Sequence, residues 1–164
     1  MRKLRPDPVT LLDKYRGRDF HPLYTTSVTV RAGDAAHGRA CGIAISDDGE
    51  LLVDLRLPVE MGGTGGGTNP EQLFAAGYSA CFHGALSMLA ERAGLAIPDA
   101  SVTATVSFGR DPVDGLYVIV ANINIHLPGL AKAVAEELVR TTERLCPYSK
   151  MAQNGIESVV ALTQ

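Results

Sequence analysis

One segment constrains the fold of this 164-residue chain most: a glycine-rich stretch that runs directly into a long apolar helix. Residues 61–69 hold five glycines, which predicts a loop with unusual backbone angles. Asn69 followed by Pro70 is a favourable helix start, and Thr68 with Glu71 offers a capping box one residue earlier. Apolar side chains then fill most of the helix circumference, so we expect a helix that is buried on nearly all sides.

Segments on both sides of this helix show the alternating pattern of strands. Strands are expected before the helix at residues 23–31, 39–46 and 51–57, and after it at 101–108 and 117–126. A second helix opens after Pro128 and Gly129 and is stopped by Pro147, and a short last strand covers residues 156–162. This order predicts an α+β domain, with antiparallel sheet packed on two long helices that include the buried central one.

The ends and the charge of the chain limit the class of protein. Residues 1–21 carry prolines and charges with few apolar residues in register, so we expect a terminal extension before a single domain at residues 22–164. A formal charge of −3 argues against a nucleic-acid surface, which needs clustered Lys and Arg. We find neither a signal peptide nor a segment near the ~20 apolar residues of a membrane helix, which predicts a cytoplasmic protein without membrane contact.

Motifs for nucleotides and metals are missing. The glycine-rich loop does not end in Gly-Lys-Ser/Thr, and no strand-helix-strand unit with a suitably placed acidic residue surrounds it. The cysteines and the four scattered histidines lack the spacing of a zinc site, so we expect neither a metal nor a bound cofactor. The loop is better explained as one whose backbone passes close to other atoms, or to a second subunit.

Two of the three cysteines lie in settings that suggest thiol chemistry, and an odd number suits free or transiently bonded thiols in a reducing compartment. Cys81 lies within the apolar helix. Gly77 and Ala85, one turn away on either side, leave room above its sulfur. Tyr78 and Phe82 are placed to wall an apolar channel, so we predict that they bind an apolar substrate.

Cys146 lies where Pro147 must break the second helix, and a helix end moves more easily than its middle. Such mobility suits a resolving thiol, which must approach a sulfenic acid. Cys41, on a predicted strand, is interpreted as structural. A reactive Cys81 needs a positive partner, because the thiolate is the nucleophile and the start of its own helix is too far away. A buried arginine is the natural candidate.

The stretch from Thr68 to Phe82, together with Cys146-Pro147-Tyr148-Ser149, resembles the OsmC/Ohr family in its branch of organic hydroperoxide resistance proteins. The likeness extends from about Leu23 to the C-terminus. It implies an intertwined homodimer with two active sites at the subunit interface. It also implies a cysteine peroxidase for organic, fatty-acid-type hydroperoxides, whose reductant is a dihydrolipoyl group carried on lipoylated proteins or a small dithiol.

The resemblance also implies roles for single residues. It makes Cys81 the peroxidatic cysteine, Cys146 the resolving one, and Glu71 a catalytic carboxylate. Ten residues of straight helix put Glu71 about 15 Å from Cys81, so the two cannot meet within one helix. Three alternatives follow: the segment before Ala75 is not helical, Glu71 reaches a site made with the other chain, or it serves only as a cap.

The arginine of the family does not map directly, because this chain has Asp34 where that arginine is expected and a longer turn around it. We expect Arg39 to supply the guanidinium, with Arg31 as the second choice. Two other functions stay open. One is a redox-responsive protein that binds an apolar ligand with little or no turnover, and the other is a protein whose cysteines only fill the core.

Overall fold

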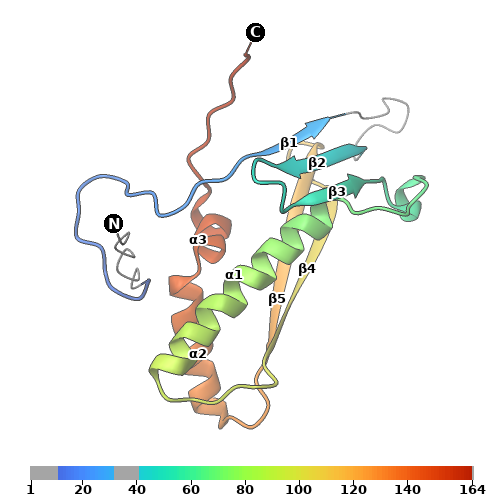
Figure 1. Cartoon of the computed structure of the whole chain (residues 1–164). Coiled ribbons are helices and arrows are strands. Elements are labelled where there is room, and N and C mark those ends of the chain that lie inside the picture. The colour runs from blue at the N-terminus through green and yellow to red at the C-terminus, as the bar shows by residue number, and fades with distance from the viewer. Residues whose placement is uncertain (1–10, 32–40, 164) are drawn as a thin grey trace.

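The structure is a computed structural model that describes residues 11–31 and 41–163 (Figure 1). Its helices and strands confirm the predicted α+β class. In chain order they are β1 (Val28–Arg31), β2 (Gly42–Ser46), β3 (Leu52–Leu55), η2 (Val59–Met61), α1 (Pro70–Arg92), β4 (Ser101–Arg110), β5 (Tyr117–His126), α2 (Lys132–Leu145) and α3 (Pro147–Asn154). Residues 11–27 contain neither helix nor strand, and the proposed domain boundary after residue 21 stays a prediction.

The strands form two antiparallel sheets, one in the order β1-β2-β3 and the other a ribbon of β4 and β5. These five strands were predicted, but their division into two sheets was not; β1 and β3 are shorter than expected, and the first part of the 39–46 segment lies outside the described residues. In β5, Ile123 and Ile125 are half-buried whereas Asn122, Asn124 and His126 are exposed, which confirms the predicted alternation. The half-buried face of the ribbon packs on α1.

The start of α1 follows the sequence prediction. Asn69 is the N-cap, and its side chain accepts a hydrogen bond from the Gln72 main-chain N–H at 2.9 Å. Pro70 occupies the first turn, where its missing N–H costs nothing. The alternative capping box of Thr68 and Glu71 is not formed, because the Thr68 hydroxyl donates to the Gln72 side-chain oxygen instead. Helix α1 is then continuous as far as Arg92.

The prediction that α1 is buried on nearly all sides is wrong for the single chain. Its buried residues form one stripe against β4, β5 and α2, namely Tyr78, Phe82, Ala85, Leu86 and Ala90. Small and polar residues on another side are exposed: Ala76, Ala80, His83 and Gly84. The prediction of burial rested on the apolar character of the helix as a whole. In the structure, no element described in this chain covers this side.

Helix α1 also corrects the expectation that no segment approaches a membrane helix. By length and composition alone, it is long and apolar enough to cross a membrane. In the structure, however, its buried stripe packs against the chain's own strands and helices. Its apolar character is therefore explained by packing within the protein.

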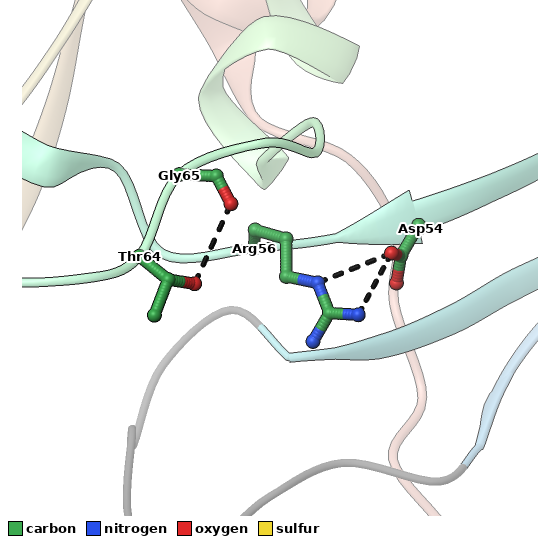
Figure 2. A network of polar contacts seen from close by, with 4 residues as sticks. All are labelled: Asp54, Arg56, Thr64 and Gly65. Atoms are coloured by element: carbon green, nitrogen blue, oxygen red, sulfur yellow. Dashed lines mark hydrogen bonds and ion pairs between the residues drawn. The ribbon is translucent and has the colours of Figure 1, made fainter.

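The glycine-rich loop lies against β3, as the predicted close backbone approach requires. Gly62 and Gly66 have φ angles of 84° and 79°, which side chains rarely adopt. At Gly67 a Cβ would lie 2.6 Å from the carbonyl oxygen of Asp54. Figure 2 shows the neighbouring surface contact, in which the Arg56 guanidinium donates to one Asp54 carboxylate oxygen at 2.9 and 3.1 Å. The loop thus carries the chain from β3 to α1.

The C-terminal part differs from the prediction in two ways. Pro147 does not end the helical region but occupies the first turn of a further helix, α3. The predicted strand at residues 156–162 is absent in this chain. That segment extends away from the other elements (Figure 1), and its apolar side chains are exposed: Ile156, Val159, Val160 and Leu162. A strand needs a neighbour to bond with, and among residues 11–31 and 41–163 none pairs with this segment.

Candidate active site

The fold brings Cys81 and Cys146 together. They are 65 residues apart in sequence, yet their Sγ atoms lie 3.6 Å from each other and both thiols are free. Cys81 comes from the middle of α1. Cys146 is the single non-helical residue between α2 and α3, with extended backbone and a main-chain N–H that bonds to the Thr142 carbonyl at 2.8 Å. The two thiols need to approach by only about 1.5 Å to reach disulfide bonding distance.

The pair lies at the edge of an apolar cluster. Cys146 is 0% exposed, while Cys81 is half-buried. Tyr78 and Phe82, the predicted channel walls, are 6% and 3% exposed and pack in the same cluster. The Tyr78 hydroxyl donates to the Ser149 hydroxyl at 3.3 Å, which ties α1 to α3. In the single chain these two aromatic side chains are core residues, and their role in binding substrate stays a prediction.

Tyr148 is a site neighbour that the sequence analysis missed. Its ring joins those of Phe74 and Tyr78, with ring centres 6.2 and 5.7 Å away. It occupies the space that the missing side chain of Gly77 leaves, because a Cβ at Gly77 would lie 2.8 Å from the Tyr148 Oη. The room predicted above the Cys81 sulfur is therefore partly filled. A glycine close in sequence to the aromatic residues Phe74 and Tyr78 of the same helix was the available signal for close packing.

Burial is the largest influence on the pKa of Cys81 and raises it above its ordinary value. A hydrogen bond from the Tyr148 main-chain N–H acts in the opposite direction. Cys146 raises the pKa further, first through the hydrogen bond between the two thiols and then through the repulsion that negative charge on both sulfurs would cause at 3.6 Å. Within the part of the chain that the structure describes, no cationic side chain is among the groups that shift this pKa.

The Tyr148 contact involves a helix that the sequence analysis did not consider. Cys81 is too far from the start of its own helix to benefit from that helix's dipole, as predicted. The hydrogen bond that lowers the pKa comes from a second helix, because Tyr148 lies in the first turn of α3. Sequence periodicity shows which helix a residue belongs to, but not which other helix points at it.

Glu71 lies in the first turn of α1 and is half-buried. Because α1 is continuous from Pro70, the alternative in which the segment before Ala75 is not helical is wrong. Glu71 lines a hollow of about 400 Å³ that lies between the start of helix α1 and strand β4. The other lining residues are Pro58, Met61, Asn69, Gln72, Ala75, Ala104, Val106 and Phe108. The other two alternatives, a site shared with a second chain and a capping role, stay open.

Arg39, which we predicted to activate Cys81, lies outside the described residues, as does Asp34. Arg31, the second choice, ends β1 and is exposed. Arg56 is partly exposed and pairs with Asp54 at 2.9 Å. Among residues 11–31 and 41–163, no group of three or more His, Cys, Asp or Glu side chains could hold a metal ion. The chemistry that the described site offers is that of two neighbouring thiols.

Comparisons with known proteins agree with this geometry. Residues 63–160 match the model of the family described as OsmC-like protein. An organic hydroperoxide resistance protein of Xanthomonas axonopodis pv. citri is 40% identical over 142 residues, which cover 85% of this chain and 94% of that protein.

Two solved structures share the fold. An organic hydroperoxide resistance protein from Legionella pneumophila has a TM-score of 0.72 at 38% identity, over 82% of this chain and 93% of that one. OhrB of Bacillus subtilis, also an organic hydroperoxide resistance protein, has a TM-score of 0.68 at 39% identity, over 81% and 93%. The chain therefore belongs to the OsmC family, in the branch of the organic hydroperoxide resistance proteins.

Proposed function

We propose that this protein is a thiol peroxidase that reduces organic, fatty-acid-type hydroperoxides to alcohols in the defence against oxidative stress. The observation that carries the proposal is the 3.6 Å separation of the Cys81 and Cys146 sulfurs. The names of its relatives, which are organic hydroperoxide resistance proteins, support the choice of substrate. Two free thiols at this distance, one within a helix and one at a helix junction, suit a cycle of oxidation and disulfide formation.

The cycle begins with the Cys81 thiolate, which attacks the distal oxygen of the hydroperoxide. The S–O bond forms as the O–O bond breaks, and the alkoxide that leaves takes up a proton to become the alcohol. The Cys146 sulfur then attacks the sulfenic acid, and water leaves as the disulfide forms. A dithiol reopens the disulfide by two exchange steps and is itself oxidised.

Cys81 must be ionised to attack, and burial opposes ionisation. A buried guanidinium stays charged and donates several hydrogen bonds in a fixed plane, so it suits this task. In our proposal Arg39 supplies it, with Arg31 as the second choice, and Glu71 orients the guanidinium. The half-buried position of Glu71 beside a hollow supports a carboxylate that works with another group rather than in bulk solvent.

The proposal includes an intertwined homodimer with the site at the subunit interface. Two surfaces of the single chain support it. One side of α1 is exposed, and the segment at residues 156–162 carries exposed valines and leucine that pair with no strand described in this chain. A second copy would cover these surfaces. It would also allow Glu71 of one subunit to act at the Cys81 site of the other subunit.

The physiological reductant in this proposal is a dihydrolipoyl group on a lipoylated protein, and the compartment is the cytoplasm, where free thiols persist. No metal or bound cofactor takes part. The exchange step needs a dithiol that can enter a mixed disulfide and then close on itself. A monothiol such as glutathione is expected to reduce the protein more slowly.

Steady-state reduction of linoleic acid hydroperoxide with dihydrolipoamide tests the proposal. The wild-type chain and a Cys41→Ser variant should turn over many times, whereas Cys81→Ser should not. The alternative, a redox-responsive protein that binds an apolar ligand, is favoured by the burial that raises the pKa of Cys81. In that case the wild type shows at most one turnover, and the peroxidase proposal is wrong.

A further inference from the structure

Helix α3 begins in an unusual way. Its N-cap is Cys146, whose side chain makes no capping hydrogen bond. The first helical residue, Pro147, has no N–H, so Tyr148 provides the first main-chain donor of the helix. The first N–H groups of any helix lack partners within it, and they carry the positive end of the helix dipole. A group outside α3 must therefore satisfy them.

The Cys81 sulfur lies at this helix start. It is 3.6 Å from the sulfur of the N-cap residue, and it accepts a hydrogen bond from the Tyr148 main-chain N–H. The first intrahelical bond, from the Lys150 N–H to the Cys146 carbonyl, is already formed at 3.1 Å, so the helix is regular directly after Tyr148. Cys81 thus takes the place of a capping side chain, although it comes from another helix.

Contacts on both sides of Tyr148 hold this arrangement in place. The Tyr148 ring lies against Gly77, one turn before Cys81, where any side chain would collide with it. The next residue of α3, Ser149, is 2% exposed and accepts the Tyr78 hydroxyl at 3.3 Å. The first turn of α3 therefore has a fixed position over the part of α1 that carries the thiol.

We propose that the first turn of α3 is a positioning element that stabilises the Cys81 thiolate through the Tyr148 main-chain N–H. The inference rests on the proposed function, for which the thiolate is the reactive form. It assigns to α3 a share of the activation that the sequence analysis gave to an arginine alone. A charged acceptor strengthens such a hydrogen bond, so the N–H acts more on the thiolate than on the thiol. Disulfide formation then removes the acceptor once the attack is complete.

The groups around Cys81 decide how the proposal can be tested. Among the described residues, the titratable side chain that acts on Cys81 is Cys146, and the other influences are burial and the Tyr148 N–H. Replacing Cys146 and Cys41 leaves Cys81 as the only thiol. Any contribution from Arg39 is the same in variants that differ only at residue 148, so it cancels in their comparison.

The test compares Tyr148→Pro with Tyr148→Ala in a Cys41→Ser, Cys146→Ala background. Both variants lose the ring, but only the proline variant loses the N–H. The measurement is the pH dependence of iodoacetamide alkylation. We expect the alkylation midpoint of the proline variant to lie about one unit higher, a tenfold smaller ionisation constant. Equal midpoints in two folded variants would overturn the proposal.

A second measurement covers the case in which the proline variant does not fold. In the same background with Tyr148 intact, the Tyr148 amide resonance is followed by NMR as the pH is raised. It should shift with the midpoint of Cys81 alkylation, and this shift should vanish in Cys81→Ser. An amide that does not respond to Cys81 ionisation contradicts the proposal. Neither measurement uses a hydroperoxide, so a failure of peroxidase activity is seen separately.

Discussion

Cys146 is completely buried, whereas Cys81, whose sulfur lies 3.6 Å away, is half-buried. A molecule from solvent therefore reaches Cys81 first. This asymmetry supports the proposed roles, in which Cys81 attacks the hydroperoxide and Cys146 reacts only with the oxidised Cys81. Two thiols that only fill the core would not need to differ in exposure, so the asymmetry also argues against that alternative.

The difference in exposure predicts the order of alkylation. In the reduced, folded protein at alkaline pH, iodoacetamide should label Cys81 at least about tenfold faster than Cys146, because the inner sulfur is reached only after local opening. Peptide mapping by mass spectrometry at successive times measures both rates. In urea the two rates should become similar. Faster labelling of Cys146 in the folded protein would contradict the assigned roles.

Gly77→Ala should destabilise the protein by about 1–3 kcal/mol, since the added Cβ lies 2.8 Å from the Tyr148 Oη and the ring must shift. Gly109→Ala in β4 is the control outside this contact, because nothing lies within 4 Å of a Cβ there. The free energy of unfolding from urea denaturation measures both. If Gly77→Ala is no more destabilising than its control, the tight contact between α1 and α3 is wrong.

Arg39→Gln should make the peroxidase activity strongly pH-dependent. Burial raises the pKa of Cys81, so without a cation the thiol stays protonated at neutral pH and ionises only above its ordinary range. The rate constant for oxidation by a hydroperoxide should therefore be low at pH 7 and rise with pH. Stopped-flow measurements across the pH range test this.

Arg31→Gln is the control for this experiment and should keep the pH profile of the wild type. The opposite result, with Arg31→Gln impaired and Arg39→Gln unchanged, would assign the guanidinium to the second choice. If both variants keep the wild-type rate constant at pH 7, neither arginine is the predicted cation, and this part of the mechanism is wrong.

The raised pKa of Cys81 also links stability to pH. A thiol whose pKa is higher in the folded state holds its proton more tightly there, so its contribution is fully present below the pKa of the unfolded chain. The contribution is lost as the pH rises through the folded value. In an Arg39→Gln background, in which the proposed cation is missing, the chain with Cys81 should thus lose stability above about pH 8.5 relative to the same chain with Cys81→Ala. Urea denaturation of both variants at several pH values measures the difference.

The C-terminal segment provides a test of the dimer. Val160 is 97% exposed in the single chain, and Val113, at the tip of the β4–β5 hairpin, is 91% exposed. If a second copy pairs with residues 156–162, Val160→Asp should weaken dimerisation while Val113→Asp should not. Sedimentation equilibrium measures both dissociation constants. Equal constants for the wild type and Val160→Asp would show that this segment is not in the interface.

Local signals explain what could be predicted from sequence. Asn69 and Pro70 specify the start of α1 through their own geometry, and the alternation around Ile123 specifies the inner face of β5. The predicted end of α2 was also correct, because Pro147 cannot continue a helix. The same residue opens α3, however, and proline favours the first turn of a helix as much as it disfavours the interior.

The parts that were missed depend on partners distant in sequence. Tyr148 reaches Cys81 and Gly77 only because α3 folds back onto α1, which no local pattern reveals. The segment at residues 156–162 has the composition of a strand but no neighbour among the parts of its own chain that the structure describes. The exposed side of α1 was predicted as buried for the same reason, since sequence shows that a surface is apolar but not what covers it.

The most direct test of the central claim is the fate of the two cysteines after one equivalent of linoleic acid hydroperoxide is added to the reduced protein. Peptide mapping without reductant should show one cross-linked pair that contains Cys81 and Cys146, with the Cys41 thiol still reduced and one equivalent of alcohol formed. If Cys81 and Cys146 both remain free thiols while the hydroperoxide persists, they are not the redox pair of a peroxidase.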